Sequence, residues 1–439
     1  MMRMVLGWQS KCAHFRGDWA NSTAHGRHIH ATSGLHAGTE SSLTASQITQ
    51  RDLLRCLEDA GVVRVSESYL DANNTRWAVS GQLNVAPEIA GAAVSRFQMA
   101  HLQEEGSNAP ARTVHLLPAG TGRQMALVNH ERAVCIMVQP LAQGLTPLSR
   151  LERRLGDSVP TVVSACSIIG TAAATASVFG AGFLLDGGPL SSDTLASLST
   201  AGWGAFAVAL ILQSHELGHS HMAARQGVPL GVPVFLPAGL GPLAAFGSLR
   251  SLLGPAPSRS AAAAIALAGP LTGLAASCSV LLVGLHFTMQ GWGGLNMTLD
   301  AFDEAGPLGA VVHAVLDHGD VAASTLDCHP WLVAGAGGVL INALALVPAG
   351  DTDGGRLATH ILGREAATRL SLLSLALLGA LGWVNQLADW WLPALLILHG
   401  SPPALCTDEV TPVSRDLKLA GLLCLCLPAA MLVPRLGAS

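Results

Sequence analysis

Charged residues are missing from six long blocks of this sequence, and their absence restricts the fold more than any other feature. Only 12% of the 439 residues are charged and 50% are hydrophobic, whereas about 25% of the residues of a soluble globular domain are charged. A helix needs about 20 mainly apolar residues to cross a bilayer, and most blocks reach that length. The blocks are residues 158–185, 194–215, 260–299, 328–350, 370–388 and, shorter, 419–434.

These blocks predict a polytopic α-helical membrane protein with about six transmembrane helices. Runs of small residues such as 261–268 and 334–338 suit helices whose backbones approach closely in lipid. The competing interpretation is a set of buried helices in a large soluble protein, but several separate blocks of spanning length favour the bilayer. The formal net charge of -5 gives no basic surface for nucleic acid. We therefore expect a lipid bilayer, and no nucleic acid, as a partner.

The residues before the first block have a different composition. Residues 1–45 are poor in acidic residues, contain Ser and Thr, and lack the apolar core of a secretory signal. They are typical either of an organellar transit peptide or of a disordered tail. Residues 46–150 mix strand-like alternation at 76–83 and 126–138 with a helical pattern at 87–105. This pattern predicts a small N-terminal α+β soluble domain over 46–150, followed by a membrane domain over 151–435.

An HExxH motif, His215-Glu216-Leu217-Gly218-His219, lies within a segment expected to be an apolar helix. A spacing of four places both imidazoles on one face of the helix, where they can chelate one Zn²⁺. Glu216 is then next to the metal and can take a proton from its water. The alternative is a polar helix end that simply faces water. Because ionisable groups in a membrane helix are costly unless they are used, we favour a metal site.

A catalytic zinc takes three protein ligands and leaves a fourth position for water, so the HExxH motif needs a partner. Asp351 and Asp353 follow the apolar block 328–350 directly, and Gly354 and Gly355 would let the backbone approach the site closely. Aspartate next to glycine is also common in ordinary turns. The residues alone therefore leave both carboxylates open as the third ligand.

The distribution of the remaining charged residues along the chain supports a site formed by the HExxH motif and one of these aspartates. If the first block crosses from side A to side B and each later block reverses the direction, His215, His219 and the two aspartates all lie near side A. The segments assigned to side B, 186–199 and 287–328, contain acidic residues and no Lys or Arg. Side A holds Arg150, Arg153, Arg154, Arg225, Arg250, Arg259, Arg356, Arg364 and Arg369. By the positive-inside rule, A is the cytoplasmic face or its organellar equivalent.

The order of these motifs resembles the site-2 protease family of intramembrane zinc metalloproteases. It is most similar to the chloroplast EGY-type (ethylene-dependent gravitropism-deficient) branch of plants and algae. The resemblance covers roughly residues 150–435. It is carried by the HExxH motif and by Ala223-Ala224-Arg225, Gly231-Val232-Pro233, Phe246-Gly247-Ser248, Ala268-Gly269-Pro270 and Asp353-Gly354-Gly355-Arg356.

The resemblance implies His215, His219 and Asp353 as the zinc ligands and Glu216 as the general base. Asp351 does not match the family position and remains the second choice. The family usually has an asparagine where this chain has Ala345; Asn342, one helical turn earlier, is a possible substrate-orienting residue. We interpret His221, His313, His318 and His329 as solvated or structural, not as ligands.

The expected function is hydrolysis of peptide bonds in or near transmembrane segments of membrane-protein substrates. The resemblance implies a multi-pass protein of a chloroplast membrane, and the sorted charges predict an active site that opens toward the positive-inside face. Two alternatives remain: a non-proteolytic membrane scaffold or chaperone derived from the protease fold, and a metal or ion transporter. Internal repeats would favour the transporter, and we find none in the sequence. The residues do not indicate an oligomeric state.

Overall fold

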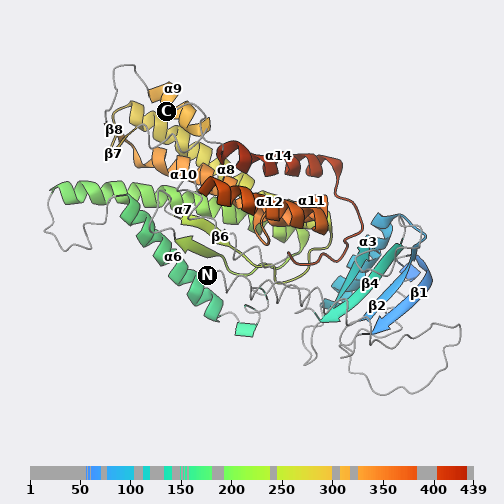
Figure 1. The fold of residues 1–439 in the computed structure, drawn as a ribbon. Coiled ribbons are helices and arrows are strands. Elements are labelled where there is room, and N and C mark those ends of the chain that lie inside the picture. Colours follow the sequence, from blue (N-terminus) through green and yellow to red (C-terminus); the bar gives the residue numbers. More distant parts are fainter. Residues whose placement is uncertain are drawn as a thin grey trace. The chain divides into compact units, whose positions relative to one another are not determined.

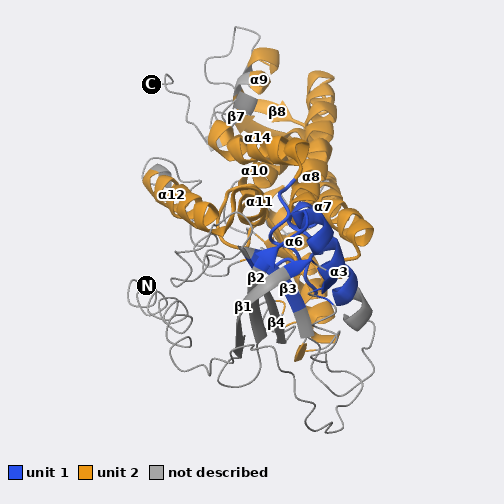
Figure 2. Ribbon diagram, turned by 90° about the vertical axis from the view of Figure 1, so that its right-hand side faces the viewer, with its two compact units in different colours: residues 1–146, 254–261, 404–413 blue, residues 147–253, 262–403, 414–439 orange. Residues whose placement is uncertain are grey.

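The computed structural model of the chain describes two compact units, which are coloured separately in Figure 2. The described residues are 56, 58–59, 61–70, 77–102, 112–118, 133–140, 149, 152, 154–155, 158–179, 192–237, 245–298, 307–316, 325–382 and 403–432. The possible transit peptide or tail over 1–45 lies outside them. Unit 1 comprises residues 1–146, 254–261 and 404–413, and unit 2 comprises the rest.

Unit 1 contains a four-stranded antiparallel sheet in the order β1-β2-β4-β3. The helix α3 begins at Pro87, where the sequence predicts a helix to begin. The hydrophobic core contains Val94 of α3 and strand residues such as Val114 and Val134. The elements are β1 (Val62–Leu70), β2 (Trp77–Leu83), α3 (Pro87–Leu102), β3 (Arg112–Pro118) and β4 (Ala133–Pro140).

Two short segments from later in the chain complete unit 1. The amide of Leu116 in β3 donates to the carbonyl of Thr407 at 2.7 Å, and the amide of Glu409 donates back to the Leu116 carbonyl at 2.9 Å. Thr407 in turn donates to the Ala256 carbonyl at 2.8 Å. The compact units therefore do not follow chain order, because the sheet of unit 1 is extended by residues far from it in sequence.

Unit 2 is mostly helical (Figure 1). Its elements are α6 (Ser158–Val178), α7 (Ser192–Gln226), β5 (Val234–Pro237), β6 (Ala245–Leu249), α8 (Arg259–Met289), β7 (Leu295–Thr298), α9 (Pro307–Leu316), β8 (Thr325–Cys328), α10 (Pro330–Ala345), α11 (Asp353–Leu362), α12 (Arg364–Gly382) and α14 (Arg415–Leu432). The strands pair as two antiparallel hairpins, β5 with β6 and β7 with β8.

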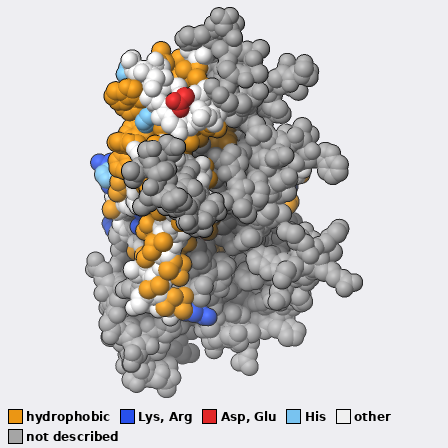
Figure 3. Space-filling model, turned by 90° about the vertical axis from the view of Figure 1, so that its left-hand side faces the viewer, with side chains coloured by type: hydrophobic (Ala, Val, Ile, Leu, Met, Phe, Trp, Pro, Cys, Tyr) orange, Lys and Arg blue, Asp and Glu red, His pale blue; other side chains and the backbone are white. Residues whose placement is uncertain are grey.

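Three helices among the described residues are long and apolar enough to cross a membrane: α6, α7 over Ala196–Gln226, and α8. Their outward side chains are largely hydrophobic, as on the face shown in Figure 3, where few charged groups interrupt the described surface. At about 1.5 Å per residue, the 16 residues of α10 are too few for a full span. The structure therefore supports a helical membrane protein, while the predicted number of six spans is not confirmed.

Candidate metal centre

Glycine residues allow α7 and α8 to pack closely at the HExxH motif. A Cβ at Gly218 would lie 2.5 Å from the Ala268 carbonyl oxygen, and a Cβ at Gly269 would lie 2.2 Å from Nε2 of His219. No real Cβ tolerates such distances, so only glycine fits at either position. The hydroxyl of Thr272 on α8 also donates to the Ser214 carbonyl on α7 at 2.9 Å. The small residues of these helices therefore create the space that the His219 ring occupies.

Three potential ligand atoms converge beside this contact. The Nε2 atoms of His215 and His219 lie 3.0 Å apart, and Oδ2 of Asp353 lies 3.3 Å and 3.4 Å from them. Ligands about 2.0–2.1 Å from a tetrahedral zinc are separated by about 3.3 Å from one another. The three buried or nearly buried groups form one of the described clusters able to hold a metal ion, and their spacing fits Zn²⁺.

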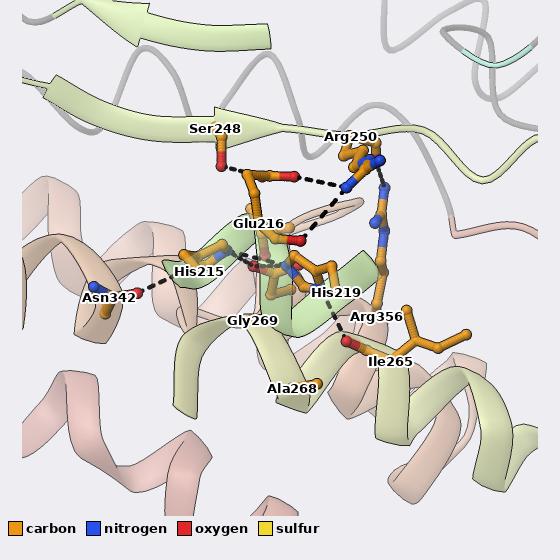
Figure 4. Close-up of polar contacts among 12 residues, drawn as sticks. His215, Glu216, His219, Ser248, Arg250, Ile265, Ala268, Gly269, Asn342 and Arg356 are labelled. Atoms are coloured by element: carbon orange, nitrogen blue, oxygen red, sulfur yellow. Dashed lines mark hydrogen bonds and ion pairs between the residues drawn. The ribbon is translucent and has the colours of Figure 1, made fainter. Parts of the chain in front are cut away.

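The other nitrogen of each imidazole contacts an oxygen acceptor (Figure 4). Nδ1 of His215 lies 2.7 Å from Oδ1 of Asn342, and Nδ1 of His219 lies 2.8 Å from the Ile265 carbonyl oxygen. The side-chain nitrogen of Asn342 donates to the Gly338 carbonyl at 2.8 Å, which orients the amide with its oxygen toward His215. Both imidazoles must therefore donate through Nδ1, and the lone pair of each Nε2 is left for a metal.

A tight turn between α10 and α11 places Asp353. Thr352 caps α11: its hydroxyl accepts from the Gly355 amide at 3.0 Å and donates to the Val347 carbonyl at 2.7 Å. A Cβ at Gly354 would lie 2.0 Å from the Leu346 carbonyl oxygen, so the turn requires glycine there. Asp353 is the first residue of α11, where the helix dipole favours a negative charge. Burial would raise the pKa of Asp353, but His219 and His215 lower it more when their Nε2 atoms carry a proton in place of a metal.

Asp351 faces a different partner. Its carboxylate accepts two hydrogen bonds from Arg356, at 2.8 Å from Nε and 3.1 Å from Nη2. Burial disfavours the charged guanidinium, yet the Asp351 carboxylate, with smaller contributions from Asp353 and Glu216, raises the pKa of Arg356. Because both oxygens of Asp351 are used in this bidentate ion pair, the geometry favours Asp353 over Asp351 as the third ligand.

Glu216 lies next to the proposed ligands and contacts the strand β6. The hydroxyl of Ser248 donates to Oε1 of Glu216 at 2.5 Å, and Nη1 of Arg250 lies 3.2 Å from Oε2. These side chains line a cavity of about 20 Å³, together with Leu230, Leu252, His219, Ile265, Asp353 and Arg356. A single water needs about 10–15 Å³ of such room, so the cavity can hold the small reactant that a base requires.

The motifs of the sequence predict the candidate ligands but not the groups that contact them. The sequence predicts Asn342 as a possible substrate-orienting residue, one helical turn before the usual asparagine of the family. In the structure its amide oxygen lies 2.7 Å from Nδ1 of His215. Ser248 and Arg250 lie about 30 residues beyond the HExxH motif, with no spacing rule that connects them to Glu216. Ile265 contributes through its backbone carbonyl, which side-chain chemistry does not reveal.

Two histidines and an aspartate thus converge beside a glutamate, an arrangement that can hold one metal ion next to a base. Residues 203–378 match the model of peptidase family M50. The comparison confirms the resemblance to the site-2 protease family. No solved structure matches the chain significantly.

The chain is also similar to plant proteins. It is 31% identical over 242 residues to the probable zinc metalloprotease EGY2, chloroplastic, of Arabidopsis thaliana, over 55% of this chain and 43% of that protein. It is 32% identical over 234 residues to the probable zinc metalloprotease EGY1, chloroplastic, of the same plant, over 52% of this chain and 42% of that protein. The matches therefore span less than half the length of these relatives.

Proposed function

We propose that this chain is a zinc-dependent metalloprotease that hydrolyses peptide bonds in or near transmembrane segments of membrane-protein substrates. The convergence of the His215, His219 and Asp353 ligand atoms, with Nδ1 of both histidines already bonded elsewhere, is the observation that carries this proposal. The names of the similar plant proteins support both zinc and proteolysis. The site would be catalytic and not structural, because three protein ligands leave one position open.

His215, His219 and Asp353 would hold the metal, and the remaining chemistry falls to Glu216. Zinc supplies Lewis acidity, which lowers the pKa of water to about 7 and polarises the carbonyl of the scissile bond. A carboxylate oxygen of Glu216 accepts the proton of the attacking water and delivers it to the leaving amide nitrogen. Glu216 lines the same cavity as His219 and Asp353, which supports this role.

A transmembrane helix must unwind before it can be cleaved, because its backbone groups are bonded internally. The hairpin of β5 and β6 lies beside the site, since Ser248 of β6 contacts Glu216. We propose that β6 binds the unwound substrate as an added strand. The similarity to chloroplastic proteins supports a chloroplast membrane as the location, with a soluble domain over 46–150, the protease domain over 151–435 and about six spans.

Replacing Glu216 by Gln tests the function. The variant should keep its zinc and cleave a single-span membrane substrate about 10²–10⁴-fold more slowly than the wild type, because glutamine cannot accept the proton. Arg225→Gln is a matched control, since Arg225 is exposed at the end of α7. Cleavage at the wild-type rate by Glu216→Gln would contradict the mechanism. A zinc-loaded wild type that cleaves no membrane substrate would favour the scaffold alternative.

A further inference from the structure

We propose that Arg250, assisted by Ser248, is a positioning residue that keeps the Glu216 carboxylate directed toward β6 and out of the open coordination position of the metal. This inference rests on the proposed function and extends it to residues of the strand proposed to bind the substrate. Arg250 follows the last residue of β6 directly, and Ser248 lies two residues before it. Alternate residues of an extended segment lie on the same face, so both side chains can reach the same carboxylate.

Ser248 and Arg250 each contact a different oxygen of the Glu216 carboxylate. Ser248 bonds Oε1 at 2.5 Å and Arg250 contacts Oε2 at 3.2 Å, as Figure 4 shows. Only 5% of the Glu216 side chain and 18% of the Arg250 side chain are exposed. A pair so shielded is screened by solvent less than a surface ion pair. Both oxygens of Glu216 are therefore fixed by groups from one segment.

The guanidinium is itself fixed by several contacts. Nε of Arg250 donates to the Gly231 carbonyl at 2.7 Å, and Nη1 donates to the Ser220 hydroxyl at 2.5 Å. The backbone carbonyl of Arg250 accepts from Nη2 of Arg356 at 2.9 Å. Arg356 is held in turn by Asp351. This chain of contacts connects the turn that carries Asp353 to the base, so Arg250 is a rigid support and not a mobile surface cation.

The contacts of Ser248 and Arg250 prevent the Glu216 carboxylate from becoming a ligand of the metal. Carboxylate oxygens are good zinc ligands, and a site with four protein ligands is closed and structural. Glu216 is adjacent to His215 in sequence, so a carboxylate released from β6 is available as a fourth ligand. By holding both oxygens, Ser248 and Arg250 keep Glu216 as a proton acceptor. The strand proposed to bind the substrate thus also determines whether the base is correctly placed.

A double-mutant cycle on the cobalt-substituted full-length chain tests this inference without a substrate. The readout is the affinity for acetohydroxamate, a small ligand that needs an open metal position, followed through the visible spectrum of Co²⁺. We expect Arg250→Gln to keep one Co²⁺ per chain and to lose about tenfold or more in acetohydroxamate affinity, as for other groups that support a metal site. Arg250→Gln should have no further effect in a Glu216→Gln background, because its effect acts through the carboxylate. Arg250→Lys should recover part of the loss.

Two further variants keep the test decisive. Ser248→Ala should give a smaller loss of the same non-additive kind, and it serves if Arg250→Gln does not fold. Arg225→Gln should match the wild type. Two results would overturn the inference and assign Arg250 a structural role. One is that Arg250→Gln lowers the acetohydroxamate affinity by the same factor with and without Glu216→Gln, and the other is that Arg250→Gln loses Co²⁺. If the wild type binds acetohydroxamate but cleaves no substrate, the proposed function fails while the cycle still decides the role of Arg250.

In a proteolysis assay, the same inference predicts that replacing Arg250 changes kcat but not KM. Arg250→Gln should lower kcat by about 10²-fold, the scale of a misplaced reacting group, while KM stays within about twofold of the wild-type value. An increase in KM with an unchanged kcat would instead show that Arg250 acts by binding the substrate.

Discussion

Unit 2 buries histidines at the candidate metal centre and at the start of α10, among other places, and these two differ in which atoms face an acceptor. At the candidate metal centre, Nδ1 of His215 and of His219 faces an oxygen, so each ring donates there and keeps the lone pair of Nε2. At the start of α10, Nδ1 of His329 accepts a hydrogen bond from the Trp331 amide at 3.2 Å. His329 is thus a helix cap with aromatic neighbours, among them Phe287 and Trp331. Burial is common to all three histidines, so it is the bonding of Nδ1 that separates the two candidate ligands from the helix cap.

The largest effect that this comparison predicts is at a glycine. Gly269→Ala should weaken zinc binding by more than about 100-fold, because the new Cβ would lie 2.2 Å from Nε2 of His219 and displace that ring. Isothermal titration with Zn²⁺ measures the loss. Gly202→Ala on α7 is the control, since nothing lies within 4 Å of a Cβ there. Equal zinc affinity in both variants would show that His219 does not need its observed position.

The oxygen that faces His215 should give the next largest effect. Asn342→Leu removes the acceptor of the Nδ1 hydrogen bond and should lower the zinc affinity by about 10–100-fold. Ser277→Ala is a useful contrast, because Ser277 contacts only the nitrogen of the same amide, at 3.3 Å, and its removal should cost less. An unchanged affinity in Asn342→Leu would mean that the orientation of His215 does not depend on this contact.

The smallest effect is expected at His329. His329→Ala should leave the zinc content unchanged and destabilise the start of α10 by about 1 kcal/mol, the usual effect of losing a helix cap. Hydrogen exchange of the amides near Trp331 would report the change. Zinc loss from this variant would remove the distinction between the two kinds of histidine.

Protonation should weaken the same cap. Burial lowers the pKa of His329 below its ordinary value of 6.5. The unfolded state therefore binds the proton more readily, and the stability of this helix end should be full above about pH 6.5 and fall as the pH decreases. Faster exchange near Trp331 at pH 5 than at pH 7, after correction for intrinsic rates, is the expected result, and it should be absent in His329→Ala.

Local patterns in the sequence were enough to predict much of the site. A spacing of four residues places His215 and His219 on one helix face whatever surrounds them. The sorted charges predict that the aspartates lie on the same side of the membrane. The choice between Asp353 and Asp351 was not determined by spacing, because it depends on the partner that Arg356 takes. The family resemblance favoured Asp353, and in the structure Oδ2 of Asp353 lies 3.3 Å and 3.4 Å from the two imidazoles.

Contacts between distant segments could not be predicted in the same way. The approach of Asn342 to His215 depends on how α10 packs against α7, and the approach of Arg250 to Glu216 depends on the path of the chain between α7 and α8. The set of segments that forms unit 1 also depends on distant contacts, because residues 404–413 bond to β3 across almost 300 positions of the sequence. Periodicity describes one element at a time and carries no information on these pairings.

The central claim is that the HExxH motif and the turn before α11 hold a single zinc ion. Metal analysis of the purified wild type beside His215→Ala, Asp353→Ala and Asp351→Asn tests it most directly. We predict one zinc per wild-type chain, none in His215→Ala or Asp353→Ala, and one in Asp351→Asn. Zinc retained by Asp353→Ala and lost from Asp351→Asn would contradict the assignment of the third ligand, and a wild type without zinc would contradict the metal centre itself.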